Sequence, residues 1–305
     1  MKRSEHRLKR GFQGNHVSFF PSHRLAARAG LVFTALLAFL ASSTPLACQQ
    51  GERPLPFPLS TPNIQVFQAG EELLYEVSYL GMGLGSISTR LTSVDTAHGR
   101  RRIAAECLIR TYRGVPFVTL NTLFQTVMGD SLESVFFRNK EFFPEDSAYK
   151  YIEYSFPKNQ NRVVVSETFD NDPSWDKKDT LYLEGKRWQD GLSLFFFARA
   201  YAHTTQNRHV PVLMYLTKAT TTIHFGVEKE EEDIDAVDYD IRCRKLEGET
   251  GFTGIFGLTG GFEGWFSDDA AAIPIRAKMH VLIGSVHIEL VKWKRKGWKP
   301  PRATD

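Results

Sequence analysis

The chain has 305 residues, 38 Lys and Arg against 35 Asp and Glu, and 42% hydrophobic residues, a composition typical of a globular protein. Seven of the basic residues but only one acidic residue lie in the first 47, so the remainder carries a net charge of −3. Because the other basic residues are scattered, the sequence argues against a nucleic-acid partner.

The amino terminus has the pattern of an export signal. A basic stretch precedes an uninterrupted apolar run at 29–41, which is short for a membrane span and typical of a signal-peptide core. We predict a signal peptide over residues 1–47 and an exported protein of the periplasm or cell envelope. An uncleaved anchor is the alternative interpretation.

Cys48 follows Ala47 directly after this segment, an arrangement that resembles a bacterial lipoprotein cleavage site. Pro45 stands where that site has leucine, so lipidation of Cys48 and ordinary cleavage both stay open. An amino-terminal lipid is the one membrane contact that we predict. Residues 48–66 contain four prolines among polar residues and predict an extended tether.

Residues 67–295 are predicted to form a single β-rich domain, followed by a tail at 296–305. Short alternating patterns separated by turn residues predict strands at 75–79, 86–94, 101–112, 117–128, 132–137, 149–156, 161–169, 180–183, 210–216, 220–227 and 239–246. At 117–128, where apolar and polar residues mix, a short helix is the alternative. The glycines of 81–85 precede strand-type residues, so they predict a hairpin corner and not a phosphate loop. The polar stretch at 170–179 predicts a loop, and the acid-rich run at 228–240 predicts a solvated hairpin tip.

One segment, Asp190–His203, has helix-type spacing, with Asp190 placed to cap its start. Its aromatic residues fill the core against a sheet in one interpretation and line a ligand cavity in the other.

The last long segment reads as a β-hairpin. Apolar residues alternate over 275–283 and 286–290, and Gly284-Ser285 between them predicts a two-residue turn. Upstream, Asp268 and Asp269 follow Trp265, and their carboxylates suit either turn chemistry or a ligand or cation site at the rim of a sheet.

Together these patterns predict an all-β, mainly antiparallel fold: a strongly curved or barrel-like sheet with one helix at or in its concave face. Curvature removes the exposed edges that an open sheet of this size would carry. Cys107 and Cys243, each on a strand pattern, are either two buried thiols or a disulfide. No histidine pair has zinc spacing and no G-x-S-x-G occurs, so we predict no metal, cofactor or catalytic residue.

Three motifs resemble the bacterial exported family catalogued as domain of unknown function 3108. They are Phe67-x-x-Gly70-Glu71-x-Leu73-x-Tyr75, Asp190-Gly191-Leu192-Ser193, and Trp265-Phe266-Ser267-Asp268-Asp269 with Ile273-Pro274-Ile275. The resemblance spans roughly residues 67–293 and implies an exported, mostly β domain. It implies no activity and no catalytic residue.

The leading functional hypothesis is a non-enzymatic binding module for an apolar or amphipathic envelope ligand, either lipid or glycan. It rests on export, on 38 aromatic residues and on the Phe-rich helix. The candidate ligand-binding residues are Phe195, Phe196, Tyr201, Trp265, Asp268, Asp269 and Asp190. The alternative is a structural or assembly protein of the envelope that acts through surface contacts. An enzyme is the third hypothesis, and the sequence identifies no protein partner.

Overall fold

The computed structural model describes residues 61–97, 100–115, 119–143, 148–157, 160–170, 172–252, 260–281 and 283–304. All of them belong to one compact unit. The predicted signal peptide and Cys48 lie outside the described residues. None of the helices in the described ranges is long and apolar enough to cross a membrane.

The described elements are strands, one α-helix and one 3-10 turn. In chain order they are η1 (Ile64–Val66), β1 (Glu72–Tyr79), β2 (Met82–Ala97), β3 (Arg100–Thr111), β4 (Asn121–Met128), β5 (Ser134–Phe143), β6 (Ala148–Ser155), β7 (Arg162–Phe169), β8 (Asp172–Tyr182), α1 (Ser193–Ala200), β9 (Arg208–Met214), β10 (Thr217–Glu232), β11 (Ile241–Thr250), β12 (Gly260–Ser267), β13 (Pro274–His280) and β14 (Ser285–Lys294).

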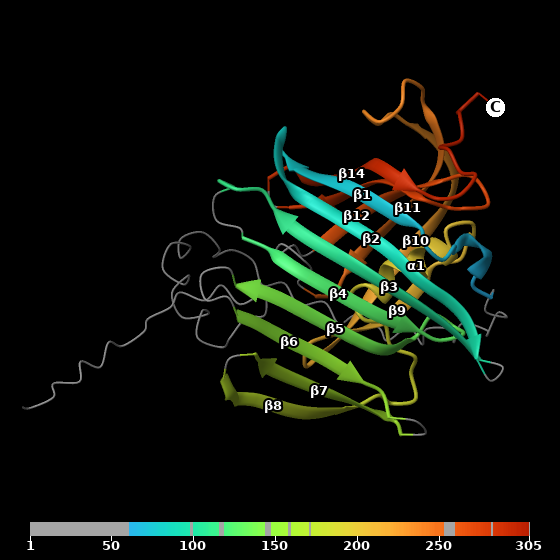
Figure 1. Cartoon of the computed structure of the whole chain (residues 1–305). Helices are drawn as coiled ribbons and strands as arrows, with labels where there is room; N and C mark the ends of the chain where they lie inside the picture. Colours follow the sequence, from blue (N-terminus) through green and yellow to red (C-terminus); the bar gives the residue numbers. More distant parts are fainter. Residues whose placement is uncertain are drawn as a thin grey trace, which may run out of the picture. The chain divides into compact units, whose positions relative to one another are not determined.

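The strands form one antiparallel sheet in the order β8-β7-β6-β5-β4-β3-β2-β1-β14-β13-β12-β11-β10-β9 (Figure 1). Two meanders, β1–β8 and β9–β14, meet where the first strand pairs with the last, from Glu72↔Lys294 to Tyr79↔Val286. The sheet is curled but not closed, with β8 and β9 at its edges. This confirms the predicted all-β, strongly curved fold.

Side-chain contacts show how far the sheet curls. The turn between β9 and β10 reaches β6 and β7, because Tyr215 donates its backbone N–H to the Tyr154 hydroxyl (2.6 Å) and its own hydroxyl to Glu167 Oε2 (2.6 Å). Helix α1 contacts η1 and β4. The helix therefore packs at the concave face, as predicted.

Buried and exposed side chains alternate along the strands, and the buried ones form the core. On β3, Ile103, Ala105, Cys107 and Ile109 are each at most 5% exposed, while the residues between them are partly exposed. One buried cluster joins both meanders, and it consists of Leu73, Tyr75, Ile234, Ile241, Cys243, Trp265, Ala271, Ile273, Ile275 and Leu290. Cys107 and Cys243 are both free and buried, and burial raises the pKa of the Cys107 thiol to about 12.

The predicted loop at 170–179 is wrong, because most of that stretch belongs to β8, which pairs with β7 from Arg162↔Tyr182 to Phe169↔Asp172. The sequence there is polar on both faces and lacks the expected alternation. An edge strand has only one neighbour and tolerates charges on both faces, and such charges block pairing with other chains. The short predicted strand at 180–183 is the end of β8.

Two predicted turns are displaced. The first hairpin turns at Leu80-Gly81, and Gly83 and Gly85 lie inside β2, where a β-carbon on Gly85 would stand 2.2 Å from the Arg110 carbonyl oxygen. In the last hairpin, His280 pairs with Ser285, so Ser285 is the first residue of β14 and does not belong to a Gly284-Ser285 turn as predicted.

Other boundaries differ in length. Helix α1 is shorter than the predicted 190–203, and β10 extends through the first acidic residues to pair Glu232 with Ile241. The end of the predicted tether is packed, since Asn63 N–H donates to the Ala200 carbonyl (3.0 Å) and Val66 is 1% exposed. The predicted tail also packs, because Arg302 forms a β-bridge with Ile241.

Candidate functional site

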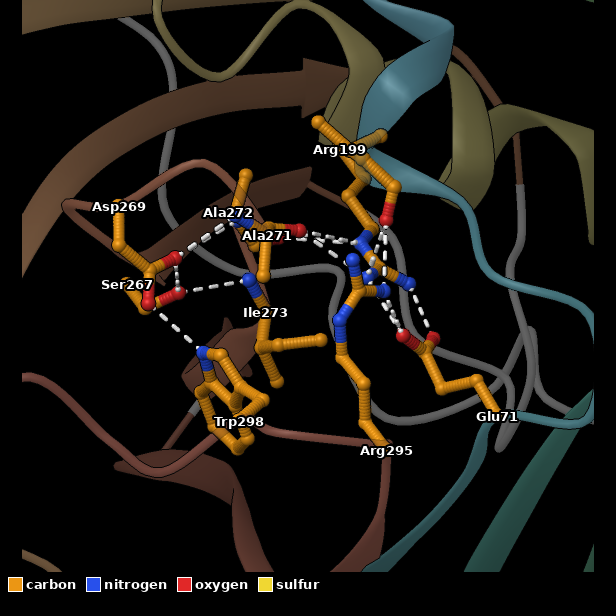
Figure 2. Close-up of polar contacts among 10 residues, drawn as sticks. Glu71, Arg199, Ser267, Asp269, Ala271, Ala272, Ile273, Arg295 and Trp298 are labelled. Carbon is orange, nitrogen blue, oxygen red and sulfur yellow. Dashed lines mark hydrogen bonds and ion pairs between the residues drawn. The ribbon is translucent and has the colours of Figure 1, made fainter.

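A buried ion cluster joins the start of the sheet, the helix and the carboxyl-terminal end of β14 (Figure 2). Arg199 of α1 is fully buried and donates two hydrogen bonds to the carboxylate of Glu71, one of them 2.9 Å long. Arg295, just after β14, also binds this carboxylate. Two guanidinium groups therefore share one carboxylate, which leaves an excess positive charge on the cluster.

Backbone carbonyls compensate for part of that excess charge. Arg199 donates to the carbonyls of Ala271 (3.0 Å), Ala272 (3.1 Å) and Val66 (3.0 Å). Arg295 donates to the same Val66 carbonyl (2.8 Å). A buried charge is tolerated only when it is paired and hydrogen-bonded, and this arrangement meets that condition.

Asp269 shapes the turn that presents those carbonyls. Its Oδ1 accepts hydrogen bonds from Ser267 Oγ (2.8 Å) and from the backbone N–H groups of Ala271 (2.9 Å) and Ala272 (3.1 Å). Its Oδ2 accepts one from Trp298 Nε1 (2.7 Å). These are the contacts of turn chemistry, the first of the two interpretations of Asp269.

Asp268 points to a different set of partners. Its carboxylate accepts from Arg244 Nε (2.6 Å) and pairs with Lys229 (3.0 Å) and Arg242 (3.5 Å). Burial alone would raise the pKa of Asp268, but the hydrogen bonds from Arg244 and Lys229 outweigh it and hold that pKa below its usual range.

Asp268→Asn is expected to lower the free energy of unfolding at pH 7 by about 1–2 kcal/mol, because charged hydrogen bonds are lost. A carboxylate whose pKa is lower in the folded state stabilises above its ordinary pKa and loses that contribution as pH falls through the folded pKa. Urea denaturation at pH 7 and below pH ~4 should therefore show a smaller acid-induced loss for the variant than for wild type. Asp238→Asn, at an exposed position, is the control, and equal pH dependence of Asp268→Asn and wild type would contradict the prediction.

A pocket of about 370 Å³ opens directly over the ion cluster. It is lined by Gln68, Ala69, Gly70, Glu71, Trp293, Lys294, Arg295, Lys296 and Trp298. This volume lies at the lower end of the range of small-molecule sites. The pocket lies where the chain enters β1 and leaves β14, so it is built at the junction of the two meanders.

The pocket combines aromatic faces with positive charge. The rings of Trp293 and Trp298 meet edge to face, with centroids 5.6 Å apart and an angle of 82°. Lys296 is exposed and has no ion-pair partner in the described ranges, whereas Lys294 pairs with Glu72 (3.1 Å). Stacking surfaces beside an unpaired cation suit a ligand that has both an apolar or ring surface and an anionic group.

The residues predicted from the sequence lie outside this pocket. On the helix, Phe196 is 1% exposed and packs against Phe67 (5.8 Å between centroids), Phe195 is half-buried, and Tyr201 is buried with Arg208 over its ring. Trp265 is buried and donates its indole N–H to Glu230 (2.6 Å).

Asp190 is a buried cap. Its Oδ1 accepts the N–H groups of Leu192 (2.8 Å) and Ser193 (2.7 Å), and its Oδ2 accepts the hydroxyls of Thr126 and Ser134 (both 2.7 Å). The predicted capping role of Asp190 is thus confirmed. Burial raises the pKa of Asp190, and these four hydrogen bonds oppose that rise.

Sequence reasoning missed the pocket residues, although a signal existed. Five basic residues and two tryptophans are clustered within 292–299, in contrast to the scattered basic residues of the rest of the domain. The pocket also depends on Glu71 and Arg295, which are 224 positions apart. Across the described ranges, no group of three or more His, Cys, Asp or Glu side chains is placed to hold a metal ion.

Comparison with known proteins gives a family and distant structural likenesses. The model of the family "Protein of unknown function (DUF3108)" matches residues 74–291. A β-barrel-like protein of family DUF1849 from Brucella abortus is similar, with 14% identity and a TM-score of 0.47 over 73% of this chain and 96% of that one. A proposed exported protein of YmcC-like fold from Bacteroides fragilis has 12% identity and a TM-score of 0.35 over 77% and 98%. A search of curated proteins found no match.

Proposed function

Since the chain belongs to the DUF3108 family, whose function is unknown, we propose a function from its own geometry: a non-enzymatic binding module of the cell envelope. Its ligand is an amphipathic envelope component, lipid or glycan, that carries an anionic group. The observation that supports this most is the pocket of about 370 Å³ between Trp293, Trp298 and Lys296. Export is part of the proposal and is supported by the basic and apolar pattern of residues 1–47.

The floor of the pocket favours an anion. Glu71 and Arg295 both line it, and Arg199 lies behind them with no exposure to solvent. The carboxylate of Glu71 is already shared by two guanidinium groups, so it neutralises only one of them. A phosphate or carboxylate on the ligand would meet a net positive field from the cluster and from Lys296.

The first test identifies the ligand. Native mass spectrometry of the protein purified from its own envelope fraction should show a co-purifying anionic lipid or glycan. The mass of the protein itself reports whether residues 1–47 are removed and whether Cys48 is acylated. A protein that carries no ligand and binds none of the probes described next would overturn the proposal.

Lys296→Glu is expected to weaken binding of an anionic amphiphile roughly tenfold, because it reverses the charge of a lysine in the pocket wall that has no ion-pair partner among the described residues. Titration with dodecyl phosphate, followed by tryptophan fluorescence, measures the effect, and dodecyl maltoside tests a neutral sugar amphiphile. Lys299→Glu is the matched control, since Lys299 is exposed three residues away and does not line the pocket. Equal losses in both variants would show that binding does not involve this pocket.

The second candidate function is a structural or assembly protein that acts through its surface. It is supported by the exposure of Leu80 (65%), Met82 (59%) and Ile283 (69%). Leu80 directly follows Tyr79, the last residue of β1, whereas the pocket residues Gln68–Glu71 directly precede Glu72, its first residue. The exposed apolar side chains and the pocket therefore lie at opposite ends of β1.

A further inference from the structure

The turn of the β1–β2 hairpin, the turn of the β13–β14 hairpin and the end of β3 lie at the same end of the sheet (Figure 1). The turn of the β1–β2 hairpin lies beside the turn of the β13–β14 hairpin, because the Tyr79 hydroxyl donates to the Ile283 carbonyl (2.7 Å). A β-carbon placed on Gly284 would lie 3.4 Å from Leu80 Cδ2. The end of β3 completes the group, since Tyr112 N–H donates to the Leu84 carbonyl (2.9 Å).

The large hydrophobic side chains that are strongly exposed are concentrated here. Of the five in the described ranges, four lie in these turns or directly next to them: Leu80, Met82, Tyr112 and Ile283, which we name the apolar tip. Exposed hydrophobic residues are usually scattered singly over a surface, so their grouping at one end indicates an interaction site.

Leu80 is unfavourable for the fold on two counts. It is 65% exposed, and its φ of 48° lies in the left-handed region, where a branched side chain is strained. Leu80 and Gly81 are the two central residues of a hairpin turn with φ positive at both, for which asparagine followed by glycine is the preferred sequence. A residue that the fold disfavours at its own position is a signature of function.

The charges around the apolar tip are mainly positive. Arg110 and Arg113 are both exposed, and neither has an ion-pair partner among the residues that the structure describes. The acidic residue Glu76 also lies near the tip, with its Oε1 3.0 Å from a β-carbon placed on Gly83. Apolar side chains flanked by free arginines complement the anionic headgroups and acyl boundary of a bilayer.

We infer that the apolar tip docks the protein on an anionic lipid bilayer by inserting Leu80, Met82 and Ile283 at headgroup depth. Four side chains on narrow turns are few for a stable protein interface, which takes about 20–30 residues from each partner. The same side chains suffice for a reversible membrane contact, which scales with the few apolar groups inserted and the charge around them. This contact is separate from the pocket and from any lipid on Cys48.

The experiment uses the full chain as isolated from cells and vesicles of equal parts phosphatidylglycerol and phosphatidylethanolamine. Hydrogen–deuterium exchange should slow at residues 77–84 and 279–286 when vesicles are added, which locates the contact independently of the amino terminus. Leu80→Asn should abolish this protection. It should also lower roughly tenfold that part of the protein's partition coefficient between solution and vesicles which is due to the apolar tip. The same variant should unfold at an equal or higher urea concentration, because it creates the preferred turn sequence.

Tyr182→Asn is the matched control. Tyr182 is 70% exposed at the end of β8, away from the apolar tip, so its replacement should leave exchange and partition unchanged. Unchanged exchange at both hairpins in the presence of vesicles would overturn the inference. Equal protection by vesicles of phosphatidylcholine alone would overturn the role of the arginines. Protection of the tip by a protein partner, with none by vesicles, would replace the bilayer with that partner.

Discussion

Glu71→Gln will destabilise the protein by about 3–5 kcal/mol, because it leaves the guanidinium groups of Arg199 and Arg295 without a carboxylate. Arg199 is 0% exposed, so water cannot solvate the uncompensated charge. The three backbone carbonyls around the cluster each stabilise a guanidinium N–H, but none carries the charge of a carboxylate. Urea denaturation followed by circular dichroism measures the loss.

The neighbouring residue provides the control. Glu72 is next to Glu71 in the sequence, but its side chain is 42% exposed and pairs with Arg90 and Lys294 at the surface. Glu72→Gln should change stability by no more than about 1 kcal/mol, as expected for an exposed ion pair. If the two variants lose the same stability, the buried cluster does not hold the helix to the sheet in the way described.

Asp190→Ala should be similarly severe, at about 3–5 kcal/mol, because four donors lose their acceptor inside the protein. Two are backbone N–H groups at the start of α1, and two are hydroxyls on β4 and β5. Asp190→Asn keeps one oxygen for the backbone N–H groups, and the hydroxyls can turn to accept from its amide, so about 1–2 kcal/mol is expected.

Comparing the stabilities of Asp190→Ala and Asp190→Asn distinguishes a structural role of the Asp190 carboxylate from a role in ligand binding. Thermal or urea unfolding of both variants gives the order of stability, and Asp170→Ala, at an exposed turn, should stay within about 0.5 kcal/mol of wild type. A folded, stable Asp190→Ala protein would show that the carboxylate is not needed for the fold and would restore Asp190 as a ligand-binding candidate.

The fold was predictable because its signal is local. Strands such as β3 show the period-2 pattern from Ile103 to Ile109, and the helix shows a cap and a change of period within one segment. Predictions failed where local pattern and structure differ. β8 needs no buried face as an edge strand, and Ser285 lies in β14 and not in the turn because it pairs with His280.

The candidate site was not predictable in the same way. Its cluster joins residues 128 positions apart, Glu71 and Arg199, and no pattern within a strand or helix reports such a contact. The sequence did show the basic and aromatic stretch at 292–299, but only the structure places it over a buried carboxylate with two arginines. Asp268 and Asp269 were predicted as candidate site residues because they form an acidic pair in the sequence. In the structure they have different partners, Arg244 and Trp298, since side chains of adjacent residues generally point in different directions.

The pairing of β1 with β14 has a consequence for how the polypeptide acquires its structure. These strands are neighbours in the sheet and are separated by almost the whole described sequence, so the β1–β8 meander can form early, whereas β14 completes both the second meander and the seam with β1 only once the carboxyl-terminal residues have been made. A chain that ends before Ser285 exposes two unpaired inner edges in place of one seam, which invites aggregation.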